Sequence, residues 1–575
     1  MNQIFRTPPA ATGAEPSKPA PAAATGKERR GVPATPPVQI AHIVSVAGSH
    51  AIAIIERPTQ GALAAKDPRV QIGALVKIVT PASSVMGLVS AVTAPMPNAD
   101  GHDEMGLIEI NLAGEVGIDE QSKRLTFRRG VSQLPSIGDP VLFADRHDLT
   151  RVYAPPAVAS IKVGTLFQDP SVPARLLTDD LLAKHFIVVG STGSGKSCAL
   201  TAILQRMLYE HAGAHVVILD VHNEYSAAFE GMVEKITLNN FNLPFWLLNF
   251  AELSAALTSK DAHHDAELEI LSEAVVYAKR RYSEAAAGRA RRPADGAGHT
   301  ISVDTPTPFR LSDVTAYIDD RLGKLERTHM TLPYRRLKTQ IEMLVADQRY
   351  NFMFGSLTIQ DTMTDVLSRL FRIPNEGRPI TVVDLSTAPP EILDVIISVI
   401  SRLAFDLAVW SNGAVPMLLV CEEAHRYAPA GADINFAPTR QALSRIAKEG
   451  RKYSLSLALV TQRPSDLDPN ILSQCGTAVA LRLSSERDQQ VIRANTYEGM
   501  IDLLDFLPLL GDREAIVLGQ GTSMPMRIKF DVLGKGAVPK NMNAGFSKSW
   551  KTQKLERASL DAIVTRWRQG GREKE

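Results

Sequence analysis

One segment, GSTGSGKS at 190–197, constrains this chain more than any other part of its sequence. It follows the apolar run FIVV, which is typical of a buried β-strand, and it precedes CALTAILQRML, which is typical of a helix. Glycines in such a turn let the backbone curl around a polyphosphate and aim its N–H groups inward, and the dipole of the following helix adds positive potential. The spacing G-x-x-x-x-G-K-S between a strand and a helix therefore predicts a phosphate-binding loop.

The last two residues of this loop carry its expected chemistry. Lys196 is expected to reach the β- and γ-phosphates of a nucleoside triphosphate, and the Ser197 hydroxyl is expected to ligate Mg²⁺. A chance glycine turn before a helix is the weaker interpretation, because every consensus position and both flanks are present. The residues predicted to contact the nucleotide are Gly190, Ser191, Thr192, Gly193, Ser194, Gly195, Lys196, Ser197 and Cys198.

Strand-like and helix-like runs alternate from about residue 160 to residue 535. Alternation of this kind predicts βαβ units, and hence an α/β fold with a mostly parallel sheet. The candidate strands are Phe186–Val189, Val216–Asp220, Ile380–Leu385, Met417–Cys421, Leu455–Thr461 and Ala478–Leu483.

The N-terminal part of the chain has a different composition. Residues 1–37 are rich in Ala, Pro and Thr, and they carry too little apolar surface to offset the entropy of ordering, so a disordered tail is predicted. Residues 38–155 contain short Val- and Ile-rich runs bounded by Gly, Pro, Asn or Asp. Short strands at this spacing indicate a small β-barrel or sandwich.

Two further segments stand apart from the alternating pattern. The block 251–375 is polar and is predicted to be a helical insertion, with a mobile loop over 279–298. The segment from 546 to 569 is predicted to form one amphipathic helix. Its apolar stripe would contain Trp550, Leu555, Ile563 and Trp567.

Adjacent acids follow a buried strand in VPMLLVCEEAHRYAP. A strand that ends in an acid places a carboxylate at the edge of the sheet where ligands bind. Glu422 is predicted to hold the Mg²⁺ shell, where Asp is usual, and Glu423 to orient the attacking water as a base; a solvated pair is the alternative. Asp220, at the end of the run VVILD, is a further metal candidate, with Glu224 or an ordinary solvated turn as alternatives.

Polar and cationic side chains complete the candidate site. Gln462 follows the run LALVT, where an amide at a strand end can sense the γ-phosphate, and a capping role is the alternative. A guanidinium offered to a neighbouring subunit's nucleotide would stabilise charge on the transferring phosphoryl group. Arg451 is the preferred candidate for this finger and Arg445 the second, and an ordinary basic helix end is the alternative for either.

Overall charge, cysteine content and the lack of long apolar runs limit the possible partners and locations of the protein. The chain has 63 Lys and Arg against 62 Asp and Glu, so it is not a polycation, and any nucleic acid would need positive charge concentrated on one surface or in a channel. Its three cysteines lack the spacing of a disulfide framework or a zinc site. No apolar run approaches the roughly 20 residues of a membrane span, and no signal peptide is evident, so a cytoplasmic location is expected.

Several motifs occur in the order found in HerA-type ATPases, relatives of the FtsK DNA pumps within the RecA-like class. They are IVVGSTGSGKS, ILDVHNEY, LPFWLLNFAEL, LLVCEEAHRYAP, IAKEGRKY with LALVTQRPS, and CGTAVALRL. The doubled Glu followed by Ala-His is more specific than the phosphate loop. The chain resembles this family over about 38–535, strongly in the core and weakly in the insertion.

The resemblance implies a domain organisation and a cofactor. It implies a HAS-barrel over 38–155, a RecA-like core built from 156–250 and 376–535, and a C-terminal brace on the adjacent subunit over 536–575. It also implies a homohexameric ring that hydrolyses ATP with Mg²⁺ at subunit interfaces.

The same resemblance implies double-stranded DNA in the central pore and a nuclease on the HAS-barrel, either NurA-type in DNA end resection or sirtuin-like or other effector nucleases in anti-phage defence. Pore loops that grip DNA phosphates need basic side chains. The candidates are Lys279, Arg280, Arg281, Arg289, Arg291, Arg292, Arg335, Arg336 and Lys338, for each of which a solvated surface is the alternative.

Two functions from different classes fit these observations. The first is an ATP-driven double-stranded DNA translocase or helicase motor that serves a nuclease. The second is an ATP-dependent scaffold ring that assembles and activates an effector nuclease without processive translocation. A conjugative or secretion ATPase at a membrane is a third, disfavoured by the lack of a membrane-spanning run.

Overall fold

The computed structural model describes residues 39–55, 70–93, 106–118, 123–154, 158–258, 263–287, 301–324, 331–355, 359–431, 437–495, 501–534, 536–540 and 557–568. The predicted N-terminal tail over 1–37 lies outside these residues. So do Trp550 and Leu555 of the predicted C-terminal helix.

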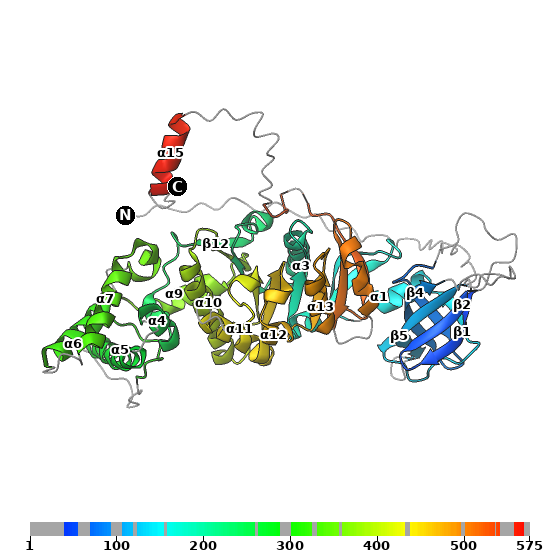
Figure 1. Cartoon of the computed structure of the whole chain (residues 1–575), viewed down its shortest axis with the longest axis horizontal. Helices are drawn as coiled ribbons and strands as arrows, with labels where there is room; N and C mark the ends of the chain where they lie inside the picture. The colour runs from blue at the N-terminus through cyan, green and yellow to red at the C-terminus, as the bar shows by residue number, and fades with distance from the viewer. Residues whose placement is uncertain are drawn as a thin grey trace, which may run out of the picture. The chain divides into compact units, whose positions relative to one another are not determined.

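The first described strands close into a barrel (Figure 1). The strand order in the sheet is β2-β1-β7-β3-β4-β5-β6. A further pairing of β2 with β5 closes the six strands from β2 to β5 of this order into a barrel, and β6 extends it beside β5. Branched apolar side chains such as Ile43, Ile78 and Ile110 are fully buried inside it, so of the predicted barrel or sandwich the Val- and Ile-rich runs form a small closed barrel. The strands are β1 (Gln39–Ala47), β2 (His50–Ile55), β3 (Leu75–Val79), β4 (Ser84–Thr93), β5 (Leu107–Ile118), β6 (Leu125–Arg129) and β7 (Pro140–Phe143), followed by α1 (Arg146–Tyr153).

The larger sheet has eleven strands in the order β12-β13-β11-β14-β15-β10-β16-β17-β18-β8-β9. The strands from β12 to β16 in this order are parallel, which confirms the predicted mostly parallel α/β fold. Their bounds are β12 (Val233–Thr237), β13 (Ile380–Asp384), β11 (His215–Asp220), β14 (Met417–Glu422), β15 (Leu455–Thr461), β10 (Phe186–Val189) and β16 (Thr477–Ala480).

An antiparallel extension on one side of this sheet was not predicted. It comprises β17 (Glu514–Gly519), β18 (Met526–Phe530), β8 (Ser160–Leu166) and β9 (Pro173–Leu177). β8 and β9 form one hairpin and β17 and β18 form another, each without an intervening helix, and β8 pairs with β18 from a distant part of the chain. A search for strand–helix alternation therefore does not detect them.

Helices and 3-10 turns connect the strands of the core. The helix after the phosphate loop is α3 (Lys196–Glu210), which is buried on most of its length and drawn beside the sheet in Figure 1. The others are α2 (Thr178–Ala183), η1 (Ser226–Phe229), η2 (Phe245–Leu247), α9 (Met363–Phe371), α10 (Pro390–Trp410), η5 (Ala424–Arg426), α11 (Ala437–Glu449), η7 (Gly450–Tyr453), η8 (Pro464–Asp466), α12 (Pro469–Leu472), α13 (Glu486–Ala494) and η9 (Ile501–Leu509).

The predicted helical insertion is mostly helical in its described residues. It contains α4 (Phe250–Leu257), α5 (His264–Ala287), α6 (Leu311–Lys324), α7 (Thr331–Ala346), η4 (Gln348–Tyr350) and α8 (Asn351–Phe354), and α5, α6 and α7 pack on one another. The prediction of a mobile loop over 279–298 is wrong for residues 279–287, which are the last part of α5. The apolar period that continues through Ala274, Val275 and Ala278 extends the helix through the basic stretch.

The basic residues of the insertion are mostly engaged within it. Lys279 is 1% exposed, and its Nζ atom donates to the carbonyls of Val303 and Thr305, each at 2.6 Å, so its prediction as a DNA contact is wrong. The cations of Arg281, Arg336 and Lys338 lie 3.3, 3.5 and 2.7 Å from Asp313, Glu267 and Asp319 respectively. Arg289, Arg291 and Arg292 lie outside the described residues.

The end of the chain contributes α15 (Arg557–Arg568). Leu560 is 58% exposed and Ile563 is 41% exposed, so neither packs into the described part of the chain. Across the residues that the structure describes, no helix is long and apolar enough to cross a membrane.

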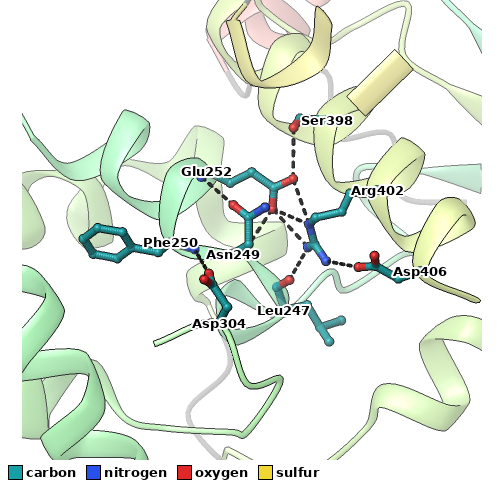
Figure 2. Close-up of polar contacts among 8 residues, drawn as sticks. All are labelled: Leu247, Asn249, Phe250, Glu252, Asp304, Ser398, Arg402 and Asp406. Carbon is teal, nitrogen blue, oxygen red and sulfur yellow. Dashed lines mark hydrogen bonds and ion pairs between the residues drawn. The ribbon is translucent and has the colours of Figure 1, made fainter. Parts of the chain in front are cut away.

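A buried polar cluster holds the insertion on the core (Figure 2). Asn249 and Glu252 form a capping box at the start of α4, in which each side chain accepts a hydrogen bond from the other residue's backbone N–H. The Glu252 carboxylate then accepts from Ser398 and Arg402, both on α10, at 2.9 Å and about 3.0 Å. The Arg402 guanidinium also donates to the carbonyl of Leu247 and to Asp406. The Glu252 carboxylate therefore caps the first helix of the insertion and also bonds it to α10 of the core.

Replacing Arg402 with Met is expected to loosen this junction, because it leaves Glu252 buried without its cation. Removing one partner of a buried ion pair costs about 3–5 kcal/mol. The expected result is an increase of about 100-fold or more in the hydrogen-exchange rates of the α4 amides, measured by mass spectrometry of the native protein.

The exposed pair of Lys324 and Asp320, with a 2.6 Å contact, gives the control. Lys324→Met should leave the exchange rates unchanged, since exposed ion pairs contribute little. Unchanged α4 exchange in the Arg402 variant would show that the pair does not hold the insertion in place.

Candidate nucleotide-binding site

The candidate site lies at one edge of the large sheet, where the parallel strands end. The strand registers pair Val189 with Thr461, Glu422 with Val460, and Leu219 with Cys421. The carboxyl ends of β10, β15, β14 and β11 are therefore level with one another. This register brings the phosphate loop and the three predicted strand-end groups to the same edge, as expected for ligand binding in open α/β sheets.

The phosphate loop has the backbone geometry that its glycines predict. Gly193 and Gly195 have φ angles of +77° and +98°, and Gly195 is the N-cap of α3. A Cβ atom at Gly190 would lie 2.4 Å from the Oγ atom of Ser194, so this position has no room for a side chain. The loop therefore requires glycine for two separate reasons, positive φ and close contact.

Lys196 is a buried cation that is influenced by several carboxylates of the site. Burial lowers its pKa, while Glu423, Glu224 and Glu422 act in the opposite direction. Its Nζ atom lies 3.5 Å from the carbonyl of Ser191, at the start of the same loop. A polyphosphate bound in the loop would supply the negative charge that a buried ammonium needs.

The structure brings Glu224, rather than Asp220, to the predicted metal-binding hydroxyl. The Ser197 Oγ atom donates to Glu224 Oε2 at 2.5 Å. Asp220 is fully buried, and its carboxylate accepts from the backbone N–H groups of His222, Glu224 and Tyr225 at 3.0–3.2 Å. Asp220 thus stabilises the turn that presents Glu224. The assignment of Asp220 as a metal ligand stays a prediction, and Glu224 is the carboxylate that contacts Ser197.

The two adjacent acids have different surroundings. Glu422 Oε2 accepts from the backbone N–H of Val221 at 3.0 Å, and burial together with the neighbouring Asp220 raises the pKa of Glu422 well above its usual value. Glu423 has a φ angle of +47°, a left-handed conformation that is uncommon outside glycine and occurs at functional sites. Glu423 is 7% exposed, and among the described residues its Oε2 atom has no hydrogen-bond donor. An acceptor without a donor is what a base for an attacking water requires.

Gln462 lies beside the phosphate loop. Its Oε1 atom accepts a hydrogen bond from the hydroxyl of Thr192, at the centre of the loop. Thr461, the preceding residue, is level with the last residue of β10. The predicted sensor therefore touches the phosphate loop directly, and its role in sensing the γ-phosphate stays a prediction.

One residue close to these groups was missed. His425 follows Glu423 by two positions, and its Nδ1 atom lies 3.0 Å from Thr461 Oγ1 and 3.3 Å from Glu423 Oε2. The sequence signal was present, because His425 belongs to the same CEEAHRYAP motif. Its contact with Thr461 joins the turn after β14 to the end of β15 and appears only once the sheet is assembled.

The two candidate arginine fingers face different surroundings. Arg445 stacks on the Phe405 ring, with its guanidinium carbon 4.3 Å from the ring centroid, and it lines a cavity of about 160 Å³ together with Glu252 and Arg402. Arg451 lines a separate cavity of about 450 Å³.

The cavity beside Arg451 lies at the opposite edge of the sheet from the phosphate loop. It is lined by Lys184 and His185, which precede β10, and by Gly476, which precedes β16. Lys448 is a further cation in its lining, and no acidic residue is among the described residues that line it. Arg451 therefore cannot reach the nucleotide of its own subunit, since the length of β10 lies between them.

The donor set of the site suits Mg²⁺ with ATP. Magnesium is usually held by one or two carboxylates, a hydroxyl, water and substrate phosphates rather than by a cage of protein ligands. In keeping with this, no group of three or more His, Cys, Asp or Glu among the described residues could hold a metal ion alone. Ser197, with Glu224 and Glu422 near it, would hold Mg²⁺, and the buried Ser194 hydroxyl, which has no partner in the described structure, suits a phosphate oxygen.

The order of strands at the site defines the class of protein. β15 stands between the phosphate-loop strand β10 and the carboxylate strand β14, which is the arrangement of the RecA-like P-loop NTPases. Residues 161–404 match the family model described as "Helicase HerA, central domain". The predicted resemblance to HerA-type ATPases is thereby confirmed, and so is the prediction that the protein is an ATPase.

Curated relatives match well beyond this central segment. The DNA double-strand break repair helicase HerA of Saccharolobus solfataricus is 25% identical over 88% of this chain and 96% of its own length. Proteins of the same name from Sulfolobus acidocaldarius and Pyrococcus furiosus are 28% and 24% identical, over 73% and 64% of this chain and 78% and 69% of their own lengths.

Proposed function

We propose that this protein is an ATP-driven double-stranded DNA translocase that works as a homohexameric ring with a partner nuclease. The observation that carries the ATP-hydrolysing part is the pair of unlike acids at the end of β14, near Lys196: Glu422 accepts a backbone hydrogen bond, whereas Oε2 of Glu423 has no hydrogen-bond donor among the described residues. The names of the HerA relatives, each a DNA double-strand break repair helicase, support duplex DNA as the substrate of the motor.

The position of Arg451 supports a ring. A cation at the opposite edge of the sheet from its own phosphate loop can act on a nucleotide only when it belongs to a neighbouring subunit. Such a donated arginine is worth on the order of 10³ to 10⁵ in the rate of phosphoryl transfer. Hydrolysis in this protein would then depend on assembly of at least two copies.

The remaining parts of the chain have proposed roles that follow the resemblance. Residues 38–155 form the HAS-barrel, which receives the nuclease, and residues 536–575 brace the adjacent subunit. The core comprises 156–250 and 376–535, interrupted by the insertion over 251–375. The assembly would act in the cytoplasm, in DNA end processing or in anti-phage defence.

Two assays on the purified protein test the motor. ATP hydrolysis is expected to rise several-fold on addition of linear duplex DNA, and a third strand bound to that duplex is expected to be released only when ATP can be hydrolysed. Both activities should fall steeply with salt, because phosphate contacts release counterions. Lys196→Ala, which removes the cation expected at the γ-phosphate, is the negative control for both measurements.

A different outcome would support the scaffold. ATP hydrolysis that is indifferent to DNA, no third-strand release, and a nuclease that stays bound through purification together would favour a ring that assembles and activates an effector. That result would exclude the translocase hypothesis, but it would not contradict the assignment of the ATPase site.

A further inference from the structure

His425 contacts two groups of the site with a single nitrogen. Its Nδ1 atom lies 3.3 Å from Oε2 of Glu423 and 3.0 Å from Oγ1 of Thr461. The side chains of His425 and Glu423 are only 13% and 9% exposed, so both contacts are shielded from bulk water. Hydrogen bonds and charges act more strongly in such surroundings than at the surface.

The available donors decide which of the two contacts is a hydrogen bond. Burial lowers the pKa of His425, so the ring is neutral near pH 7 and has one N–H and one lone pair. The Thr461 Oγ1 atom accepts from the backbone N–H of Arg463 at 3.1 Å, which leaves its own hydrogen to be donated. The consistent arrangement has Thr461 donating to Nδ1, with the ring proton on Nε2.

This arrangement leaves Glu423 available for a water molecule. Oε2 of Glu423 then receives no proton from Nδ1, in agreement with its lack of a donor among the described residues. The ring still lies against the carboxylate and restricts where it can point. A carboxylate held in place without being hydrogen-bonded keeps its full strength as an acceptor.

Thr461 extends the contact to the phosphate loop. It immediately precedes Gln462, whose Oε1 atom accepts from the hydroxyl of Thr192 in that loop. A continuous series of contacts therefore runs from Thr192 through Gln462, Thr461 and His425 to Glu423. It joins β10, β15 and the turn after β14.

We propose that His425 is a positioning residue for ATP hydrolysis: its ring, fixed by the hydrogen bond from Thr461 to Nδ1, lies against the carboxylate of Glu423, restricts its orientation and connects it, through Thr461 and Gln462, to the phosphate loop. This inference rests on Glu423 acting as the base. His425 does not touch the nucleotide, and its effect is on the hydrolytic step rather than on ATP binding.

Three substitutions separate the role of Nδ1 from the bulk of the ring. In His425→Asn, a polar atom of the amide occupies the place of Nδ1. In His425→Gln, the amide lies one bond further out, where Nε2 was. His425→Leu keeps similar bulk and removes both polar positions.

The Leu and Gln variants are expected to lose about 10- to 100-fold in kcat for ATP with KM unchanged, because a misplaced reacting group costs rate rather than binding. The Asn variant is expected to stay within about threefold of the wild type. The readout is steady-state ATP hydrolysis by the full-length protein, together with affinity for a fluorescent ATP analogue.

The controls distinguish this proposal from its premises. Adding His425→Leu to Glu423→Gln should cause no further loss, because His425 acts through the carboxylate that Glu423→Gln already removes. His211→Leu changes an exposed histidine at the C-terminal end of α3 and should leave kcat unchanged. Normal turnover by Glu423→Gln alone would refute the assignment of Glu423 as the base, on which the proposal rests, and not the observed position of His425. Failure of DNA translocation would not affect this readout.

Two results would overturn the proposal. The first is a kcat of His425→Leu equal to that of the wild type. The second is an equal loss in the Asn and Gln variants, which would mean that ring shape matters and Nδ1 does not. If the Leu variant does not fold, the comparison of Asn with Gln still decides.

Discussion

Glu423→Gln is expected to leave ATP bound and unhydrolysed. The amide has nearly the shape of the carboxylate, but it cannot take the proton of the attacking water, and loss of a general base costs about 10² to 10⁴ in rate. Since the Glu423 side chain is buried and its Oε2 atom has no donor in the described structure, no existing hydrogen bond to that atom is lost in the exchange. The measurement is single-turnover hydrolysis of ATP, with bound nucleotide identified after rapid separation of the protein.

Glu422→Gln is the matched comparison, because the two residues are adjacent and the change is identical. Glu422 accepts from the backbone at Val221 and lies near Asp220 and Glu224, so its loss should raise the Mg²⁺ concentration needed for half-maximal activity. The reverse pattern, with normal turnover in Glu423→Gln and none in Glu422→Gln, would mean that the roles assigned to the two acids are exchanged.

Arg451→Ala is expected to lower kcat for ATP by about 10³-fold or more, if the arginine is donated to a neighbouring nucleotide. Its location at the opposite edge of the sheet from the phosphate loop predicts that the defect arises between subunits. Lys452→Ala changes the next residue, which is also an exposed cation in η7, and should have little effect. Arg445→Ala should cause a smaller loss than Arg451→Ala, because Arg445 stacks on Phe405.

Mixing two inactive variants tests donation between subunits. Arg451→Ala subunits keep an intact phosphate loop, and Lys196→Ala subunits keep an intact arginine, so an interface between them combines one working copy of each. Mixed assemblies should therefore recover ATP hydrolysis above that of either variant alone. Absence of recovery in assemblies shown to contain both variants would exclude Arg451 as the donated cation.

The phosphate loop and the strands around it could be predicted from sequence because their signals are local. Phe186–Val189 and Leu455–Thr461 are strands with the predicted bounds, and Gly193 and Gly195 of the loop have positive φ angles. Glycine conformation and a short run of buried apolar residues depend on a few neighbours in the chain. The same locality explains the prediction of the barrel, whose strands are short Val- and Ile-rich runs bounded by turn residues.

Other features required the assembled fold. The basic stretch after Lys279 suggested a mobile loop, but Lys279 itself is buried because the carbonyls of Val303 and Thr305 satisfy its ammonium. The antiparallel strands β8 and β18 pair across hundreds of residues, which no local pattern specifies. Glu252 belongs to a recognised motif, but its partner Arg402 lies on a helix far along the chain.

By itself, the sequence determined the position of the phosphate loop, where a nucleoside triphosphate is predicted to bind, and the residues at strand ends that are candidates for the chemistry. Only the tertiary structure decided which candidates meet: Glu224 rather than Asp220 contacts Ser197, His425 joins Glu423 to Thr461, and Arg451 lies away from its own phosphate loop. The reason is that loop conformation follows from neighbouring residues, whereas contacts between strand ends depend on the order and register of strands that are distant in sequence.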